Sequence, residues 1–251
     1  MAPVPTSDGP APHATIPYGA HRDQVYDVRL PEGSALGCTV VLVHGGFWRP
    51  EYDRAHATQQ AHAFAASGFH VAVVEYRRAP HAGWADMSQD VRAALAAVRA
   101  DADLPGPTVL VGHSAGGHLV AWLLHQPEAR GVLGAVSLAG CVDLLLVDRL
   151  NLDDGAARDL LGCEPATDPD AWSAADPAQL GIPPAPVVLL HGTQDERVPL
   201  EVSQAYADRF PAPDGRATLW VLEGCTHFDL IDPASPHFAT TIDAVRRLRA
   251  G

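Results

Sequence analysis

Cysteines are few and scattered in this sequence, which argues against several classes of protein. The 251 residues include four cysteines, and no two of them form a C-x-x-C pair. Zinc ribbons and thiol redox motifs need closely spaced cysteines, and small secreted domains need many of them. We therefore expect neither a metal site nor a disulfide framework.

Basic residues are also scarce. The sequence has 17 Lys and Arg residues against 30 Asp and Glu residues, a formal net charge of −13, and no basic cluster. Because nucleic acids and anionic membranes attract basic surfaces, neither is an expected partner. The same excess of negative charge mildly disfavours a strongly anionic substrate.

Long hydrophobic runs are missing as well. The longest, over residues 132–147, is interrupted by Asp143 and is too short to span a bilayer. The first residues show neither the positive segment nor the apolar segment of a secretory signal. With 47% hydrophobic and 19% charged residues, the chain can bury a sizeable core, and we expect a cytoplasmic protein.

Strand-like and helix-like segments alternate along most of the chain. Residues 1–20 are rich in Pro, Ala and Gly and predict a loose lead-in, and residues 21–251 predict a single domain. Apolar β-branched runs predict buried strands, alternation over 25–30 predicts an edge strand, and 3.6-residue spacing predicts helices. The expected strands are 25–30, 39–43, 69–76, 109–112, 132–138, 186–191 and 217–222, and the expected helices are 54–67, 87–100, 119–124, 201–210 and 236–248.

This alternation predicts an α/β fold with a mostly parallel central sheet and helices on both faces. Between residues 140 and 184 the pattern loosens, with two short helical pieces at 144–150 and 156–161. We interpret this segment as a short insertion over the strand ends. Ligands of such folds bind beyond the carboxyl ends of the strands, and the candidate residues below all follow such ends.

Ser114 stands at a turn between a strand and a helix. The spacing Gly112-x-Ser114-x-Gly116 is the nucleophile-elbow pattern, in which a strained turn exposes a serine. Side chains two residues either side of the serine would collide with neighbouring segments, so glycine is needed there. The alternative is an ordinary strand-to-helix loop with a capping serine.

A serine hydroxyl needs a base within hydrogen-bond reach before it becomes a good nucleophile. Among thirteen histidines we select His227, which follows the last strand and precedes the final helix. His191 is interpreted as structural, and the side chain of His113 is expected to point away from Ser114. Five more histidines are expected at the surface: His13, His21, His56, His62 and His81.

The base needs a carboxylate that orients it and stabilises its protonated form. Asp195 follows the penultimate strand and is the preferred acid, with Asp143 and Glu196 as alternatives. An Asp in a turn often only caps the local backbone. The order Ser114, Asp195, His227 is nevertheless the order of triads in α/β-hydrolases.

Gly45 and Gly46 follow a buried strand. Glycine lets backbone N–H groups approach a ligand, and together with the N–H of Ala115 these groups are candidates for an oxyanion hole. A plain Gly-Gly turn is the alternative. Phe47 and Trp48 come next and are candidates for an aromatic wall of the substrate pocket. The chemistry expected of these residues uses no metal and no other cofactor.

Three segments together resemble the kynurenine formamidase, or arylformamidase, branch of the α/β-hydrolases. The segments are His44-Gly45-Gly46-Phe47-Trp48, the elbow from Gly112 to Leu119, and His227-Phe228-Asp229-Leu230-Ile231. The resemblance extends from about residue 39 to the end. It implies a triad and an oxyanion hole made of the residues already selected: Ser114, Asp195 and His227, and Gly45, Gly46 and Ala115.

The resemblance also implies a serine hydrolase for N-formyl-L-kynurenine or a related N-formyl arylamine. Residues 75–80 resemble carboxylesterases of the hormone-sensitive-lipase type, and residues 191–199 resemble peptidases of the prolyl oligopeptidase kind. Carboxylesterase action on small esters is therefore the alternative, and a non-catalytic ligand-binding member of the fold is a further one. The expected partner is a small-molecule substrate, and the oligomeric state stays open, a homodimer included.

Overall fold

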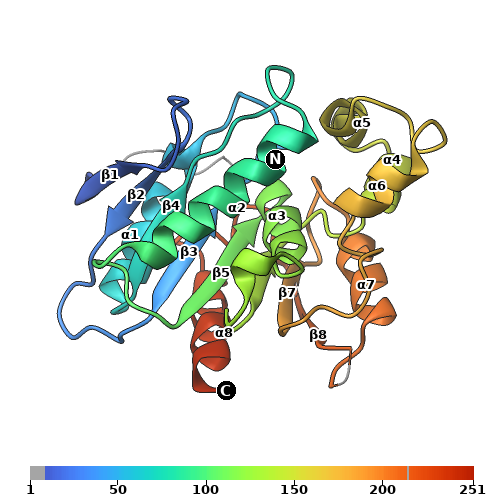
Figure 1. Cartoon of the computed structure of the whole chain (residues 1–251). Helices are drawn as coiled ribbons and strands as arrows, with labels where there is room; N and C mark the ends of the chain where they lie inside the picture. The colour runs from blue at the N-terminus through green and yellow to red at the C-terminus, as the bar shows by residue number, and fades with distance from the viewer. Residues whose placement is uncertain (1–8, 214) are drawn as a thin grey trace.

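An eight-stranded sheet forms the centre of the molecule (Figure 1). The computed structural model describes residues 9–213 and 215–251. Along the sheet the strand order is β1-β2-β4-β3-β5-β6-β7-β8. Strand β2 pairs antiparallel with both β1 and β4, and all other neighbouring strands pair in parallel. The strands are β1 (Ala14–Pro17), β2 (Val25–Arg29), β3 (Thr39–Val43), β4 (His70–Val74), β5 (Thr108–His113), β6 (Ala135–Leu138), β7 (Val187–Gly192) and β8 (Ala217–Leu222).

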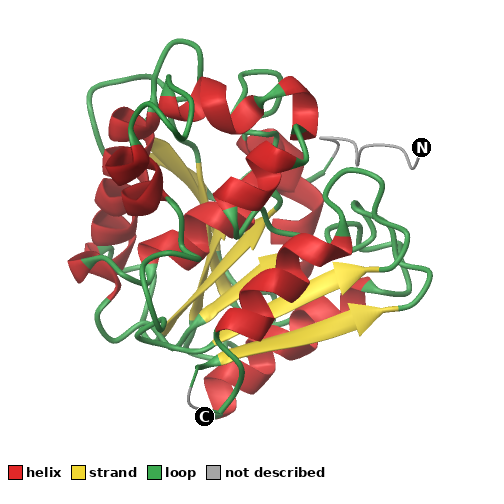
Figure 2. Cartoon of the chain, turned by 90° about the vertical axis from the view of Figure 1, so that its right-hand side faces the viewer, coloured by secondary structure: helices red, strands yellow, loops and turns green. Residues whose placement is uncertain are grey.

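Helices cover both faces of the sheet, as the alternating pattern predicts (Figure 2). One face packs against α1 and α8, and the other packs against α2, α3 and α7. The α-helices are α1 (Thr58–Ala66), α2 (Trp84–Ala100), α3 (Ala115–Leu123), α4 (Leu144–Arg149), α5 (Ala156–Leu161), α6 (Pro169–Ala175), α7 (Leu200–Arg209) and α8 (Phe238–Ala250). Short 3-10 turns lie at η1 (Arg54–Ala57), η2 (Pro127–Ala129) and η3 (Leu152–Asp154).

Strand β3 shows why this sheet is covered on both sides. All five of its residues are buried. Val41 and Val43 belong to the core under α2 and α3, whereas Val40 and Leu42 belong to the core under α1 and α8. Successive side chains of a strand point to opposite faces, so a strand between two helical layers has to be apolar at every position.

Two expectations about the N-terminal region are wrong. Residues 14–17 of the expected loose lead-in form β1, which pairs with β2, so β2 is not the edge of the sheet. The reason is that β1 is a four-residue edge strand with three exposed residues, in which only Ile16 packs against the core, and it therefore leaves no apolar pattern in the sequence. The part of that expectation that concerns residues 1–8 lies outside the described residues.

The insertion between β6 and β7 carries three short helices instead of the expected two. Helices α4 and α5 lie where the sequence predicts them, and α6 is additional. Helix α6 starts at Pro169, and the Asp168 carboxylate caps it by accepting a hydrogen bond from the N–H of Ala171 at 3.0 Å. Figure 1 shows the three helices grouped together at one end of the sheet, beside α3 and α7.

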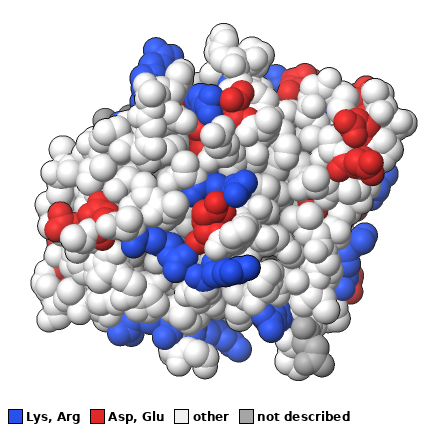
Figure 3. Space-filling model, in the orientation of Figure 1, with Lys and Arg blue, Asp and Glu red and all other residues white. Residues whose placement is uncertain are grey.

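Charges of both signs are mixed on the surface. On the face drawn in Figure 3, arginine and acidic side chains alternate across a mostly uncharged surface. Within the described part of the chain, no helix is long and apolar enough to cross a membrane.

Candidate active site

Ser114 occupies a strained turn between β5 and α3. Its backbone has φ 54° and ψ −117°, a conformation that L-residues rarely adopt. A Cβ atom on Gly112 would lie 2.1 Å from the carbonyl oxygen of Gly116, and one on Gly116 would lie 2.0 Å from the carbonyl oxygen of Val43. Both glycines are therefore required by close packing of the backbone, as the nucleophile-elbow pattern predicts.

His227 and Asp195 come from different loops and form a hydrogen bond. Nδ1 of His227 lies 2.7 Å from Oδ2 of Asp195. Because a carboxylate can only accept, Nδ1 carries the proton and Nε2 is left as the basic nitrogen. The Asp195 side chain is fully buried. Burial alone would raise the pKa of this carboxyl, but hydrogen bonds from His191 and His227 outweigh it and hold the pKa well below its usual range.

His191 is a buried neighbour of the Asp195 carboxylate. Its Nδ1 accepts a hydrogen bond from the Ser203 hydroxyl at 2.7 Å, and its Nε2 lies 2.8 Å from the Val198 carbonyl and 3.4 Å from Oδ2 of Asp195. The structural interpretation of His191 fits this position. The ring also faces the Asp195 carboxylate directly, which sequence reasoning does not reveal.

The two alternative acids lie elsewhere. Asp143 caps helix α4, where its carboxylate accepts a hydrogen bond from the N–H of Leu146 at 2.8 Å. Glu196 is exposed to solvent. Among the three candidates, Asp195 is the one whose carboxylate is paired with the imidazole of His227.

The Gly45–Gly46 turn lies directly against the elbow. A Cβ atom on Gly45 would come within 2.9 Å of Ser114 Cβ, and Gly46 has a φ of 111°, which favours glycine. Ala115 is the first residue of α3, and the first N–H groups of a helix have no acceptor inside it. The structure thus places Gly45 against Ser114, with Ala115 next to the serine in the chain, and Gly46 lines the same pocket as Ser114.

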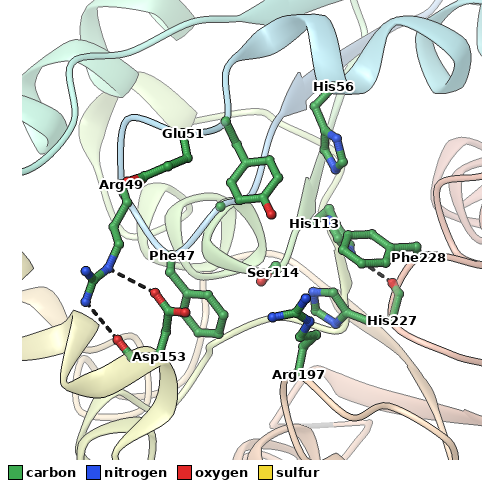
Figure 4. A pocket seen from close by; sticks show the side chains of 12 residues that line it. Phe47, Arg49, Glu51, His56, His113, Ser114, Asp153, Arg197, His227 and Phe228 are labelled. Atoms are coloured by element: carbon green, nitrogen blue, oxygen red, sulfur yellow. Dashed lines mark hydrogen bonds and ion pairs between the residues drawn. The ribbon is translucent and has the colours of Figure 1, made fainter. Parts of the chain in front are cut away.

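A pocket of about 290 Å³ opens over Ser114 (Figure 4). Ser114 and His227 face the same space, and the aromatic side chains of Phe47, Tyr52 and Phe228 form much of its apolar wall. A mostly preformed, partly apolar cleft with a few polar groups at one point is typical of small-molecule sites.

Comparison with known protein families assigns the chain to one of them. A family model described as BD-FAE matches residues 26–210. The chain belongs to the BD-FAE family.

Two curated relatives are similar to this BD-FAE protein over most of its length. Esterase LipC of Mycobacterium tuberculosis is 28% identical over 263 residues, which cover 93% of this chain and 65% of LipC, slightly less than two thirds. Kynurenine formamidase of Drosophila melanogaster is 25% identical over 228 residues, which cover 86% of this chain and 74% of that protein. The resemblance to the kynurenine formamidase branch is thereby confirmed.

Solved structures with the same fold include a truncated carbohydrate esterase from gut microbiota. It superimposes with a TM-score of 0.82 at 20% identity and covers 94% of this chain and 95% of that chain. This likeness confirms the α/β-hydrolase fold.

One predicted pocket residue of the BD-FAE protein lies outside the pocket. Phe47 lines it as expected, but Trp48 is completely buried, and its indole N–H donates to Nδ1 of His118 at 3.2 Å. The backbone at both residues has positive φ, 47° and 60°, which turns the second side chain into the core below α3. The expectation that Trp48 forms part of the aromatic wall is wrong.

Two histidines of the pocket do not lie where the sequence suggests. His113, expected to point away from Ser114, lines the same pocket, and its Nε2 donates to the His227 carbonyl at 2.9 Å. His56, expected at the surface, lines the pocket beside Phe228 with ring centroids 5.9 Å apart. Burial lowers the pKa of His56 to about 4 and places the pKa of His113 well below its ordinary value.

Cys141 is a neighbour of the serine that sequence reasoning misses. Its thiol hydrogen-bonds with the Ser114 side chain, and its backbone N–H donates to the Ser114 carbonyl at 3.2 Å. Burial keeps the pKa of this thiol far above its usual range, so the sulfur is a neutral packing group. The one signal in the sequence is that Cys141 follows the end of β6, because β6 is the strand that pairs with β5.

One group of side chains resembles a metal site in composition. Cys225, Asp229 and His237 place one potential ligand atom each within 4.8 Å of one another. Burial raises the pKa of the Cys225 thiol to about 12, and Asp229 already accepts hydrogen bonds from the N–H and hydroxyl of Thr226, both at 2.7 Å. Since metal ligands must be deprotonated and available, this group fits a loop-stabilising network better than a cation.

Proposed function

We propose that this BD-FAE protein is a serine hydrolase that acts through an acyl-enzyme. The observation that carries the proposal is the meeting of three parts over one pocket: the strained Ser114, the His227–Asp195 pair at 2.7 Å, and the Gly45–Gly46 turn against the elbow. The three parts lie in different segments of the chain, and the fold brings them together. The similarity to hydrolases such as LipC supports the same reaction class.

In the first half of the reaction, Ser114 Oγ attacks the substrate carbonyl carbon while Nε2 of His227 takes the hydroxyl proton. The Nδ1 proton of His227 stays hydrogen-bonded to Asp195, whose negative charge stabilises the imidazolium. The N–H groups of Gly45, Gly46 and Ala115 stabilise the oxyanion, where one donor is typically worth about 3 kcal/mol.

In the second half, the protonated His227 gives its proton to the leaving amine or alcohol, and the carbonyl stays attached to Ser114 as an ester. His227 then removes a proton from water, whose oxygen attacks this ester, and His227 returns that proton to Ser114 Oγ as the bond between Oγ and the acyl carbon breaks and the acid is released. No step needs a metal or another cofactor.

The preferred substrate in this proposal is N-formyl-L-kynurenine or a related N-formyl arylamine. The likeness to Drosophila kynurenine formamidase supports it, and so does the aromatic wall of Phe47, Tyr52 and Phe228 beside Ser114. A formyl group needs little room at the serine, while a flat aryl group would stack or pack against these rings.

Carboxylesterase action on small esters is the second candidate. LipC, which is an esterase by name, matches 93% of this chain. Esters and formamides use the same triad and differ in the leaving group, so the fold does not decide between them.

Hydrolysis of N-formyl-L-kynurenine, run beside phenyl acetate and a Ser114→Ala control, tests this proposal. A kcat/KM of about 10⁴ M⁻¹s⁻¹ or more on the formamide, lost in Ser114→Ala, supports the formamidase. Turnover of the ester alone would leave a carboxylesterase. No turnover, together with a fluorophosphonate probe that does not label Ser114, would indicate a non-catalytic ligand-binding protein.

A further inference from the structure

His113 lies between the nucleophile elbow and the base loop, by which we mean residues 223–229 after β8. It is the last residue of β5 and is followed directly by Ser114, and only 4% of its surface is exposed. Its ring packs beside two residues of the base loop (Figure 4), with centroids 4.5 Å from that of His227 and 5.9 Å from that of Phe228. The elbow and the base loop therefore meet at one buried imidazole.

The hydrogen bonding of His113 fixes its tautomer. Nε2 lies 2.9 Å from the carbonyl oxygen of His227, and because a carbonyl can only accept, Nε2 carries the proton. Nδ1 has no hydrogen-bond partner among the described residues, and a Cβ atom on Gly45 would lie 3.2 Å from it. The ring thus donates to the base loop on one side and packs against the oxyanion turn on the other.

The His113 ring is neutral. Burial, together with the neighbouring rings of His227 and His56, places the pKa of His113 well below its ordinary value. A positive charge at this distance from His227 would oppose the imidazolium that the proposed reaction forms. A neutral N–H donor can hold the base loop without this repulsion.

His227 is held at two points. Oδ2 of Asp195 accepts a hydrogen bond from its ring nitrogen Nδ1 at 2.7 Å, and His113 donates to its backbone carbonyl. The backbone beside His113 is itself fixed in the sheet, because the N–H of Ser114 donates to the carbonyl of Leu138 at 2.8 Å. One contact therefore orients the imidazole, and the other ties its backbone to the strand that carries the nucleophile.

We propose that His113 is a positioning residue for the catalytic base, whose Nε2–H holds the His227 backbone so that the His227 imidazole stays aligned with Ser114 Oγ. The proposal rests on the hydrolase function proposed above. Misplacing a reacting group by about 1 Å can cost about 100-fold in rate, so the loss of this hydrogen bond should lower kcat. A ring that only filled space would affect stability and leave the rate of the folded protein unchanged.

Two substitutions of similar length separate the N–H donor from the bulk of the ring. The amide of His113→Gln reaches about as far as Nε2 and keeps a donor, whereas His113→Met has none. On phenyl acetate we expect kcat and kcat/KM to fall together by about 10- to 100-fold in His113→Met, and by less than about fivefold in His113→Gln.

His70→Met is the matched control and should keep the parent rate. His70 is also a strand residue whose Nδ1 has no partner among the described residues, but it begins β4 and pairs with Thr39 at the start of β3, away from the carboxyl ends where Ser114 lies. Melting curves of all variants report stability separately from rate.

The hydrogen bond between His227 and Asp195 gives a second readout, which needs no turnover. Its Nδ1 proton is observed as a downfield resonance in the NMR spectrum. We expect this resonance to persist in His113→Gln and to shift or broaden in His113→Met, because the backbone of His227 is then no longer held.

Equal kcat in His113→Met and the parent, or equal losses in His113→Met and His113→Gln, would overturn the assignment. If His113→Met does not fold, His113→Asn takes its place, since its amide is one methylene shorter than that of glutamine and cannot reach the His227 carbonyl. A parent that hydrolyses neither formamide nor ester would overturn the proposed hydrolase. The resonance would then decide on His113: dependence on the donor keeps His113 as the group that positions the His227–Asp195 pair, and an unchanged resonance in every variant overturns it.

Discussion

The elbow at Ser114 and the Arg49–Asp153 wall face the same pocket and are built in opposite ways. Every residue from Gly112 to His118 is buried, and the backbone segments touch so closely that a Cβ atom would clash at three positions, which are all glycine. The wall is an ion pair between side chains that are 31% and 37% exposed and 104 residues apart in sequence. The difference indicates that the elbow is held by backbone packing and that the shape of the opposite pocket wall depends on adjustable side-chain contacts.

The largest effect is expected from Ser114→Ala. It removes the nucleophile and leaves the turn intact, so kcat on phenyl acetate or the formamide should fall at least about 10⁴-fold while the thermal midpoint stays close to that of the parent. Steady-state kinetics and a melting curve measure both. Residual activity near the parent level would remove Ser114 from the mechanism.

Asp195→Asn should have the next largest effect. The amide lets His227 adopt the wrong tautomer, because an NH₂ group can donate to Nδ1, and kcat should fall about 10³- to 10⁴-fold. Glu196→Gln, one residue away and exposed, is the matched control and should leave kcat unchanged. A similar loss in both variants would contradict the assignment of the acid.

Gly116→Ala tests the rigidity of the elbow itself. The added methyl group would lie 2.0 Å from the Val43 carbonyl oxygen, so α3 must move away from β3, and the free energy of unfolding should fall by about 3 kcal/mol. Gly83→Ala, where the nearest atom is 3.8 Å away, should cost less than about 1 kcal/mol. Urea unfolding of the two variants gives the comparison, and equal costs would mean that the elbow can relax.

His118, under the elbow helix, should make stability depend on pH. Burial lowers its pKa to about 4, so the folded protein keeps it neutral while the unfolded chain takes up a proton below about pH 6.5. The unfolded state then binds more protons, and His118 alone should lower stability by about 1.4 kcal/mol per pH unit as pH drops from about 6.5 toward 4, in addition to the other buried histidines with lowered pKa values.

Urea unfolding between pH 7 and 4.5 measures this slope. His118→Gln should reduce this slope by the contribution of one proton, about 1.4 kcal/mol per pH unit. His81 lies on an exposed turn, and His81→Gln is the control that should leave the slope unchanged. An equal slope in the parent and His118→Gln would show that His118 does not titrate on unfolding.

The smallest effect is expected from Arg49→Ala on the exposed wall. Partly exposed ion pairs contribute about 0–1 kcal/mol, so the free energy of unfolding should change by less than about 1 kcal/mol and phenyl acetate turnover by less than about threefold. Loss of several kcal/mol would mean that the wall is as rigid as the elbow.

Most of the fold could be predicted because its signals are local. Apolar β-branched runs mark the parallel strands, and the run over Thr39–Val43 is covered on both faces as predicted. The mostly exposed β1 was missed because only one of its four residues packs against the core, and α6 was missed because a seven-residue helix has too few turns to show a period.

The residues of the candidate site also divide into those that the sequence predicts and those that it does not. Ser114, Asp195 and His227 could be selected because each follows the carboxyl end of a strand, and parallel strands bring such ends to one edge. Whether Phe47 or Trp48 faces the pocket depends on a turn with positive φ at both residues. Phenylalanine and tryptophan rarely adopt positive φ, so the sequence does not predict this turn.

The sequence by itself determined the order of the parallel strands and of the helices that cover them, the need for glycine beside Ser114, and the loops that carry His227 and Asp195. Those features follow from periodicity and backbone sterics within a few residues. Only the tertiary structure decided that His56 and His113 line the pocket, that Arg49 pairs with Asp153, and that Arg197 stands beside His227. These contacts join loops far apart in the chain, and they depend on side-chain directions that packing selects after the strands are in register.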